Sequence, residues 1–252
     1  MQFKEKMDSG QPVFGPFMNT TDPAFVESVG HTGFDFVVSD LEHGPASLDQ
    51  LQNLIRAADV SGTFPVVRTP PGNLHMLGAV QDAGAKGILV PQNKDAEEVH
   101  EVVKATRFYP KGERGVSGVV RAAKYSAMNS EEYFSRSNEN ILIIQLEGKE
   151  AIENLDAILE VPDIDILFVG PYDLSQSLGV PGQVDHPKVI KIIEQTVRKI
   201  KAKGLVAGTF VTSPENAKKW IDVGVQFIGY SVDILIFAEA SKNIIQKLKD
   251  LK

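Results

Sequence analysis

The 252-residue sequence contains no cysteine, which excludes disulfide bonds, thiolate metal ligands and a cysteine nucleophile. It contains no apolar segment approaching about 18 residues, the length that spans a membrane, and residues 1–6 lack the apolar core of a signal peptide. Acidic residues outnumber basic ones, giving a formal net charge of -7, and no Lys/Arg-rich block is present. Neither nucleic acid nor a membrane is therefore expected as a partner, and we expect a cytoplasmic protein.

No Gly/Ser-rich linker divides the chain; a short apolar run followed by a helical pattern recurs along it instead. Short apolar runs bounded by glycine and proline are typical of buried strands in a parallel sheet. We predict such strands over residues 12–17, 34–38, 64–67, 87–90, 141–147, 164–169, 205–209 and 226–230. Several helical patterns end at a glycine, such as Gly62 and Gly204, which takes the left-handed conformation after a helix without steric cost.

Eight strand–helix units in about 250 residues have the size and rhythm of a (β/α)₈ barrel. We therefore predict an α/β fold, a TIM barrel in which residues 1–252 form one domain. The alternative is an open doubly wound sheet, but the first strand–helix turn lacks the Gly-rich phosphate fingerprint of that fold. Residues 107–140 interrupt the regular spacing, and we expect this insertion on the catalytic face.

Polar side chains follow most of the predicted strands, at the end where a barrel carries its active site. They are Asp40, Glu42, His43, Arg68, Gln92, Gln145, Glu147 and Asp173. Carboxylates, a histidine and an arginine at one rim predict a site for a divalent cation and an anionic substrate.

Glu147 and Asp173 follow neighbouring predicted strands, which lie about 5 Å apart in a sheet, so both carboxylates can share one cation. Two hard oxygen ligands suit magnesium or manganese, which keep waters and recruit substrate oxygens. Zinc is less favoured because no pair of histidines has ligand spacing. Helix capping or salt bridges would explain either acid alone.

His43 is better placed for acid–base chemistry than the other histidines, which fall on or near predicted helices. Asp40, three residues earlier, would hold the imidazole in one tautomer. Arg68 could bind a substrate carboxylate or oxyanion through its two-pronged guanidinium. The alternative is that it only forms a salt bridge at the rim of the barrel. No lysine stands at the carboxyl end of a predicted strand, so Schiff-base aldolase chemistry is disfavoured.

Six motifs along the chain resemble the HpcH/HpaI family of metal-dependent class II pyruvate aldolases. They are DLEHGP (residues 40–45), VR (67–68), DAGAKGILVP (82–91), GERG (112–115), QLE (145–147) and FVGPYDLS (168–175). The resemblance runs from about residue 12 to residue 240 and implies a barrel of the phosphoenolpyruvate/pyruvate type.

The resemblance implies roles for individual residues. It implies that Glu147 and Asp173 bind Mg²⁺, Mn²⁺ or Co²⁺, and that Arg68 stabilises a pyruvate enolate. His43 would be the acid–base residue and Asp40 its orienting partner.

The same resemblance assigns four further positions. Asp82 would be a second acid that reaches the histidine from a neighbouring subunit. Gln145 would contact the oxo acid, and backbone amides near Tyr172 and Asp173 would hold its carboxylate. We also place Phe210 in the substrate-binding set, although Phe210 and residues 209–213 are less typical of the family.

The activity implied is reversible cleavage of a 4-hydroxy-2-oxo acid to pyruvate and an aldehyde through a metal-stabilised enolate, as in 4-hydroxy-2-oxoheptanedioate and 2-dehydro-3-deoxyglucarate aldolases. Family members are hexamers, trimers of dimers, whose terminal helices exchange between subunits. The apolar set at the C-terminal end permits this exchange: Ile234, Phe237, Ile244, Ile245 and Leu248.

The sequence departs from the family at Tyr172, where a small residue or asparagine is usual, and at Gly148, where threonine is common. These changes leave the aldehyde open. A CoA-thioester lyase of the citrate-lyase type is one alternative, although the extra basic residues for the nucleotide are not seen. A non-catalytic barrel that binds an oxo acid is another.

Overall fold

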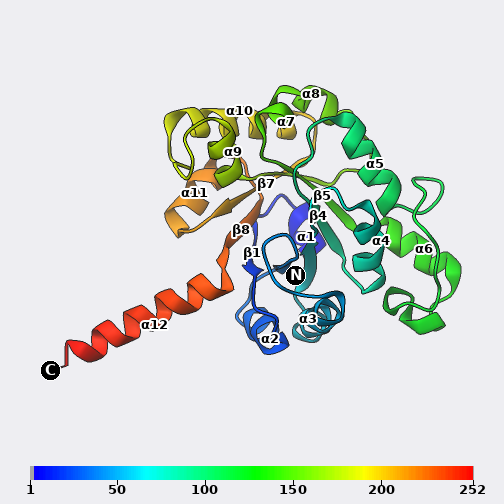
Figure 1. Ribbon diagram of the computed structural model, residues 1–252, viewed down its shortest axis with the longest axis horizontal. Coiled ribbons are helices and arrows are strands. Elements are labelled where there is room, and N and C mark those ends of the chain that lie inside the picture. The colour runs from blue at the N-terminus through cyan, green and yellow to red at the C-terminus, as the bar shows by residue number, and fades with distance from the viewer. Residues whose placement is uncertain (1–2, 252) are drawn as a thin grey trace.

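The computed structural model describes residues 3–251 and contains a closed barrel of parallel strands surrounded by helices (Figure 1). The strands are β1 (Val13–Met18), β2 (Phe36–Asp40), β3 (Phe64–Arg68), β4 (Gly87–Val90), β5 (Ile141–Leu146), β6 (Ile166–Val169), β7 (Val206–Val211) and β8 (Phe227–Val232). They pair in sequence order, and β8 pairs with β1 to close the sheet. The predicted (β/α)₈ barrel is therefore confirmed, and the open doubly wound sheet is excluded.

Helices precede, connect and follow the strands. They are α1 (Phe3–Asp8), α2 (Pro23–His31), α3 (Leu48–Ser61), α4 (Leu74–Asp82), α5 (Ala96–Thr106), the 3₁₀ helix η1 (Arg121–Ser126), α6 (Ser130–Asn138), α7 (Lys149–Glu153), α8 (Leu155–Ile158), α9 (Pro171–Ser177), α10 (Pro187–Ala202), α11 (Pro214–Val223) and α12 (Asp233–Lys249). Asn154, whose ψ of 4° leaves the helical region, separates α7 from α8.

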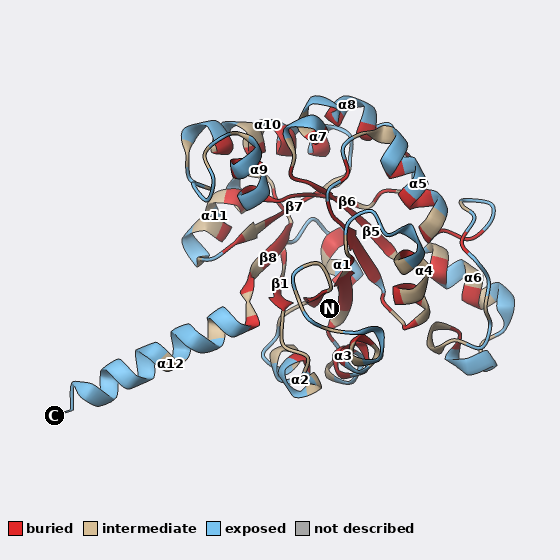
Figure 2. Ribbon diagram, viewed as in Figure 1, coloured by how far each residue is buried: buried red, intermediate tan, exposed pale blue. Residues whose placement is uncertain are grey.

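Alternate residues of each strand point into the barrel, because side chains of a strand alternate between its two faces. The apolar residues that point into the barrel form one buried cluster, which includes Phe17, Phe36, Val66, Ile143, Phe168 and Phe227. A larger cluster fills the layer between strands and helices, so the strands are buried on both faces (Figure 2). Helix α1 closes the amino-terminal end, where the Phe3 ring stacks on Phe64 with centroids 4.2 Å apart.

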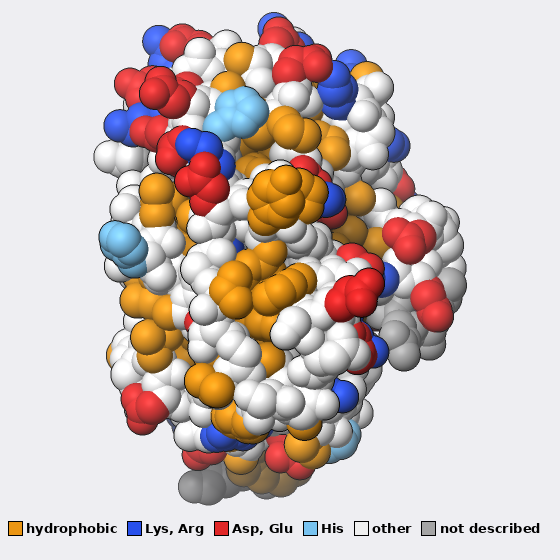
Figure 3. Space-filling model, turned by 90° about the vertical axis from the view of Figure 1, so that its right-hand side faces the viewer, with side chains coloured by type: hydrophobic (Ala, Val, Ile, Leu, Met, Phe, Trp, Pro, Cys, Tyr) orange, Lys and Arg blue, Asp and Glu red, His pale blue; other side chains and the backbone are white. Residues whose placement is uncertain are grey.

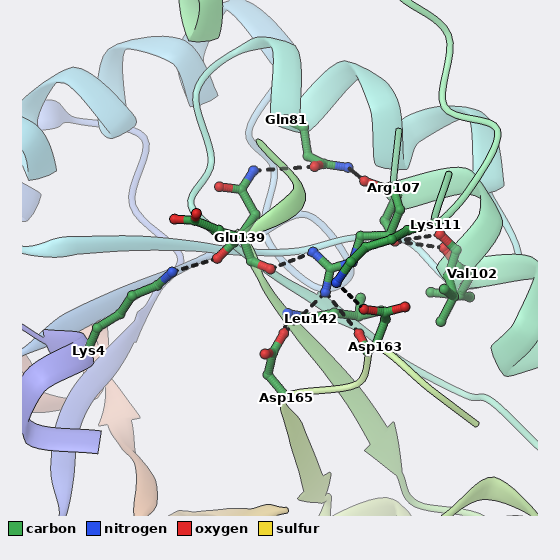
Figure 4. Close-up of polar contacts among 12 residues, drawn as sticks. Lys4, Gln81, Val102, Arg107, Lys111, Glu139, Leu142, Asp163 and Asp165 are labelled. Atoms are coloured by element: carbon green, nitrogen blue, oxygen red, sulfur yellow. Dashed lines mark hydrogen bonds and ion pairs between the residues drawn. The ribbon is translucent and has the colours of Figure 1, made fainter. Parts of the chain in front are cut away.

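The insertion at residues 107–140 lies at the amino-terminal end of the barrel, and its predicted position on the catalytic face is wrong. It joins the end of α5 to the start of β5, and such helix-to-strand connections return to the end where strands begin. Figure 4 shows how Arg107 ties this end together. Its Nη1 donates to the Asn140 carbonyl at 2.6 Å, and its Nη2 donates to the Asp163 carbonyl at 2.9 Å. The network explains why Arg107 is buried without belonging to the predicted site.

Helix α12 leaves the barrel after β8 and extends away from it (Figure 1). It is exposed along nearly its whole length, as the pale blue ribbon in Figure 2 shows, yet it carries Ile234, Phe237 and Ile244 at 51%, 61% and 59% exposure. Its first residue, Asp233, is buried and accepts hydrogen bonds from the backbone of Asn19 and Thr20, which fixes the point of departure. Among residues 3–251, no helix has the length and apolar character needed to cross a membrane.

Candidate active site

The carboxyl ends of β2 and β3 bring Asp40 and Arg68 together. The two residues are register partners in the parallel sheet, so both side chains point into the barrel. Nε and Nη2 of Arg68 donate to the two carboxylate oxygens of Asp40 at 2.9 and 2.7 Å. This two-pronged, charge-assisted contact fixes the plane of the guanidinium. Arg68 is thus oriented within the chain itself.

Arg68 makes two further contacts. Its Nη1 lies 3.1 Å from Oε2 of Glu42, an ion pair without hydrogen-bond geometry. Its Cζ lies 4.9 Å from the centroid of the Phe17 ring, a cation–π distance. Burial raises the pKa of Glu42 despite the neighbouring positive charge of Arg68. The guanidinium of Arg68 therefore contacts two carboxyl groups and one aromatic ring.

Asp40 also shapes the loop that carries His43. Its Oδ1 accepts hydrogen bonds from the backbone N–H groups of Glu42 at 3.0 Å and His43 at 3.3 Å. The His43 side chain is exposed at the mouth of the barrel, and within residues 3–251 its imidazole has no hydrogen bond. The carboxylate of Asp40 orients the backbone of His43, and its predicted role in orienting the imidazole stays a prediction.

Glu147 directly follows β5 and is 4% exposed. Its Oε1 accepts the backbone N–H of Gln92 at 2.8 Å, and its Oε2 accepts the side-chain amide of Gln145. Burial, together with the negative charges of Glu42 and Asp173, raises the pKa of Glu147 to about 7. A cation bound next to this carboxyl group would stabilise its ionised form.

Gln92, which was noted among the strand-end residues but given no role, joins two of the acids. Its Nε2 donates to Oε1 of Glu42 at 3.2 Å while its backbone N–H binds Glu147. Its φ of 58° is in the left-handed region, which is uncommon for a residue other than glycine and often marks a functional site. The sequence signal was its position after β4, and the strained backbone is visible only in the structure.

Asp173 and Tyr172 lie on the first turn of α9, directly after the carboxyl end of β6. Both side chains are exposed toward the mouth. Register places β5 beside β6, so Glu147 and Asp173 follow adjacent strands as predicted. The Tyr172 ring packs edge-on against Phe210 of β7 with centroids 5.9 Å apart. The structure therefore brings Asp40, His43, Arg68, Gln145, Glu147, Tyr172, Asp173 and Phe210 to one rim.

Asp82 is the one predicted site residue that lies elsewhere. It ends α4 and so sits at the amino-terminal end of the barrel, opposite the rim. Its Oδ1 accepts a hydrogen bond from Nη2 of buried Arg114 at 2.6 Å, and the same guanidinium binds Gln81. Asp82 cannot reach His43 of its own chain, so the predicted contact requires a second subunit.

The residues at the rim fit a divalent cation. Glu147 is a buried acid whose carboxylate forms no ion pair within residues 3–251, and Gln145 has a buried Oε1 without a hydrogen bond. Gly170 packs closely against both, since a Cβ there would lie 3.0 Å from Oε2 of Glu147 and 3.1 Å from Nε2 of Gln145. Within residues 3–251 no group of three or more acids and histidines is arranged as a metal site, so Glu147 and Asp173 would leave coordination positions for water or substrate.

Comparison with known proteins agrees with this geometry. The model of the HpcH/HpaI aldolase/citrate lyase family matches residues 14–240. A 2-keto-3-deoxy-L-rhamnonate aldolase of Klebsiella pneumoniae is 39% identical over 240 residues, which cover 94% of this chain and 89% of that protein. The enzyme of the same name from Escherichia coli K12 is 36% identical with the same coverage.

Solved structures give the same fold. The HpcH/HpaI aldolase from Desulfitobacterium hafniense superposes with a TM-score of 0.92 at 29% identity, covering 100% of this chain and 98% of that one. A citrate synthase, SbnG, superposes with a TM-score of 0.88 at 30% identity, covering 99% and 98% of the two chains. Similarity extends over the barrel and its rim in both comparisons.

Proposed function

Because the chain belongs to the HpcH/HpaI aldolase/citrate lyase family of carbon–carbon lyases, we propose that it reversibly cleaves a 4-hydroxy-2-oxo acid to pyruvate and an aldehyde. The observation that carries the proposal is the buried carboxyl group of Glu147 beside the oriented guanidinium of Arg68. The relatives named for 2-keto-3-deoxy-L-rhamnonate make 2-keto-3-deoxy sugar acids the first substrates to test.

Glu147 and Asp173 would hold the divalent cation, with Mg²⁺, Mn²⁺ and Co²⁺ as candidates. When bound, the cation would supply Lewis-acid polarisation of the 2-oxo group of the substrate. The amide of Gln145 is buried next to Glu147 and would position that carboxylate and contact the oxo acid. Backbone amides in the first turn of α9, near Tyr172 and Asp173, would bind the substrate carboxylate.

Arg68 would stabilise the negative charge that develops on the 2-oxo oxygen. Its bond to Asp40 holds the guanidinium in place before the reaction, so little reorganisation is needed when charge develops. Phe17 below it excludes water from one face of the guanidinium. The residue thus acts as a preorganised donor and not as a mobile surface charge.

His43 would move the proton at the C4 oxygen. In cleavage, the C4 hydroxyl gives its proton to the imidazole, the C3–C4 bond breaks with its electron pair remaining on C3, and C3 then takes up a proton to give pyruvate. The exposed position of His43 leaves its imidazole open to a second group. Asp82 of a neighbouring subunit would be that group, held by Arg114 in its own chain.

A homo-oligomer, expected to be a hexamer, would complete this site. The exposed apolar side chains of α12 need a covering surface, and those of the insertion, including Tyr109 at 88% and Val119 at 73% exposure, form a second apolar area. Figure 3 shows hydrophobic side chains gathered in the middle of the face over α4, α5 and α6. Exchange of α12 between subunits would bury the first of these areas.

The test is metal-dependent exchange of the C3 protons of pyruvate in D₂O, followed by mass spectrometry. We expect exchange with Mn²⁺, loss of exchange on adding EDTA, and recovery with excess Mn²⁺. Glu147→Gln should lose exchange, whereas Glu150→Gln, a change at an exposed glutamate on α7, should keep it. Exchange that is unaffected by EDTA would overturn the metal assignment, and no exchange under any condition would overturn the aldolase proposal.

The likeness to a citrate synthase favours a thioester reaction as the second candidate. It predicts that an acyl-CoA and an oxo acid give a new carbon–carbon bond with release of free CoA. Thiol release measured with a disulfide reagent distinguishes the two, because aldol cleavage releases no thiol.

A further inference from the structure

The rim of the barrel is divided into a polar half and an aromatic half. The polar half is formed by the carboxyl ends of β2 to β5 and the residues that follow them: Asp40, Glu42, Arg68, Gln92, Gln145 and Glu147. The aromatic half is formed by three rings from β1, β7 and α9: Phe17, Phe210 and Tyr172. Asp173 follows Tyr172 directly, so the candidate cation site lies where the two halves meet.

The three rings make a continuous wall that rises from the floor of the site to its mouth. Phe17 and Phe210 meet edge-to-face with centroids 5.5 Å apart, and Phe210 and Tyr172 do so at 5.9 Å. Phe17 is 4% exposed, Phe210 is half-buried and Tyr172 is 45% exposed. A substrate bound beside Arg68 would therefore have an apolar surface along its length.

The barrel makes room for this wall. A Cβ on Gly229 of β8 would lie 2.8 Å from Cε2 of Phe17, so only a residue without a side chain allows the ring to lie where it does. Behind the wall, a cavity of about 20 Å³ is lined by Tyr172, Phe210 and Trp220 among others, with Asp185 as the charged residue in that lining. Asp185 in turn forms an ion pair with Lys219 at 3.7 Å, so no free cation is offered to the site from this side.

Charge in the site disfavours a second substrate carboxylate. Arg68 is already paired with the carboxylates of Asp40 and Glu42, while Glu147 and Asp173 are assigned to the cation. A substrate anion at the far end of the aldehyde would meet these acids or the aromatic wall. Like charges about 4 Å apart repel by about 1 kcal/mol even in bulk water, and by more in a partly buried site.

We propose that Phe17, Phe210 and Tyr172 receive the far end of the aldehyde and select aldehydes whose far end is uncharged and apolar over those that end in a carboxylate. The inference rests on the proposed aldolase function and narrows its substrate class. Tyr172 sets the outer limit of the wall because it is the most exposed of the three rings.

Two acceptors of equal chain length test the selection: butanal, which ends in a methyl group, and 4-oxobutanoate, which ends in a carboxylate. The kcat/KM for addition to pyruvate is measured for both with Mn²⁺. For the wild type, kcat/KM for butanal is expected to exceed kcat/KM for 4-oxobutanoate by about tenfold or more. A tenfold ratio corresponds to about 1.4 kcal/mol, which charge repulsion and lost apolar contact would together supply. Within one variant, the ratio cancels any loss in steps common to both acceptors.

Tyr172→Arg should reduce this ratio by about tenfold or more, since it places a cation at the rim and removes the outermost ring. Tyr172→Phe should leave the ratio within about twofold, because the ring is kept. Val60→Arg is the matched control: it adds the same charge at a side chain that is 72% exposed on α3, and the ratio should not change.

Equal or better use of 4-oxobutanoate by the wild-type protein would overturn the proposal, and so would a ratio that Tyr172→Arg leaves unchanged. Exchange of the pyruvate C3 protons without addition to either acceptor would overturn it as well. Absence of metal-dependent exchange would instead show that the aldolase function has failed, so the two failures are distinguishable.

Discussion

Replacing Glu147 with glutamine is expected to stabilise the metal-free protein while abolishing its affinity for divalent cations. The folded protein raises the pKa of Glu147 from its ordinary value of 4.5 to about 7, chiefly through burial. Between these values the folded state holds a proton that the unfolded state has released. The stabilisation from this protonation is fully present below pH 4.5 and is lost as the pH rises through 7.

The size of the effect follows from the same pKa difference. At about 1.4 kcal/mol per pKa unit, the interval from 4.5 to about 7 corresponds to about 3 kcal/mol. Glutamine does not ionise, so the free energy of unfolding of the variant should exceed that of the wild type by about 2–3 kcal/mol above pH 7. A domain of this size gains about 2–4 °C in Tm per kcal/mol, which gives about 4–12 °C. The unpartnered Oε1 of Gln145 could accept a hydrogen bond from the new amide.

Thermal unfolding after dialysis against EDTA, followed from pH 4.5 to 8.5, measures the difference. The difference in Tm between the variant and the wild type should grow from pH 4.5 to pH 7 and stay constant above pH 7. Excess Mn²⁺ should narrow the gap by stabilising only the wild type. Glu150→Gln, on an exposed glutamate of α7, should follow the wild type throughout. A gap that does not change with pH, or a variant that is less stable at pH 8, would refute the reasoning.

Three further predictions concern the rest of the site. Arg68→Lys should lower kcat/KM about 10²-fold or more, measured with any active acceptor, because lysine cannot reproduce the planar two-pronged bond to its carboxylate partner. Gly229→Ala should destabilise the fold by about 1–3 kcal/mol in denaturant unfolding, because its Cβ would lie 2.8 Å from the Phe17 ring. Mixing inactive Asp82→Asn and His43→Ala subunits should restore part of the activity if the acid acts across a subunit interface, and unmixed variants should stay inactive.

The barrel could be predicted because its physical signals are local. Each strand is a short apolar run that stops at a glycine, a proline or a polar residue. Because both faces of the sheet are buried, apolar and polar residues do not need to alternate along a strand. Helix ends were equally local: Asp22 accepts a hydrogen bond from the Ala24 N–H with Pro23 at the first helical position, and Gly62 has a φ of 75°. The length of the insertion does not determine its side of the barrel; its place between α5 and β5, a helix-to-strand connection, does.

The candidate site was predicted as a set of residues but not as a set of contacts. Asp40 and Arg68 were both named, yet their direct pairing depends on the register of β2 against β3, which the sequence does not state. Glu42 and Gln92 were seen only as polar residues after strands. Their roles come from a left-handed backbone at Gln92 and from burial of Glu42, which are properties of the folded chain.

Charge balance links the cation to the substrate. Asp40, Glu42 and Glu147 surround the guanidinium of Arg68, and Asp173 adds its charge next to Glu147, so an oxo acid that enters without a cation adds another anion to an acidic site. Cation and pyruvate should therefore bind cooperatively, and by linkage each should raise the affinity for the other by the same factor. Calorimetric titration of pyruvate with and without Mg²⁺ measures that factor. We expect at least about a tenfold gain with the metal; equal affinities would show that the acids are neutralised by protons or by a neighbouring subunit instead.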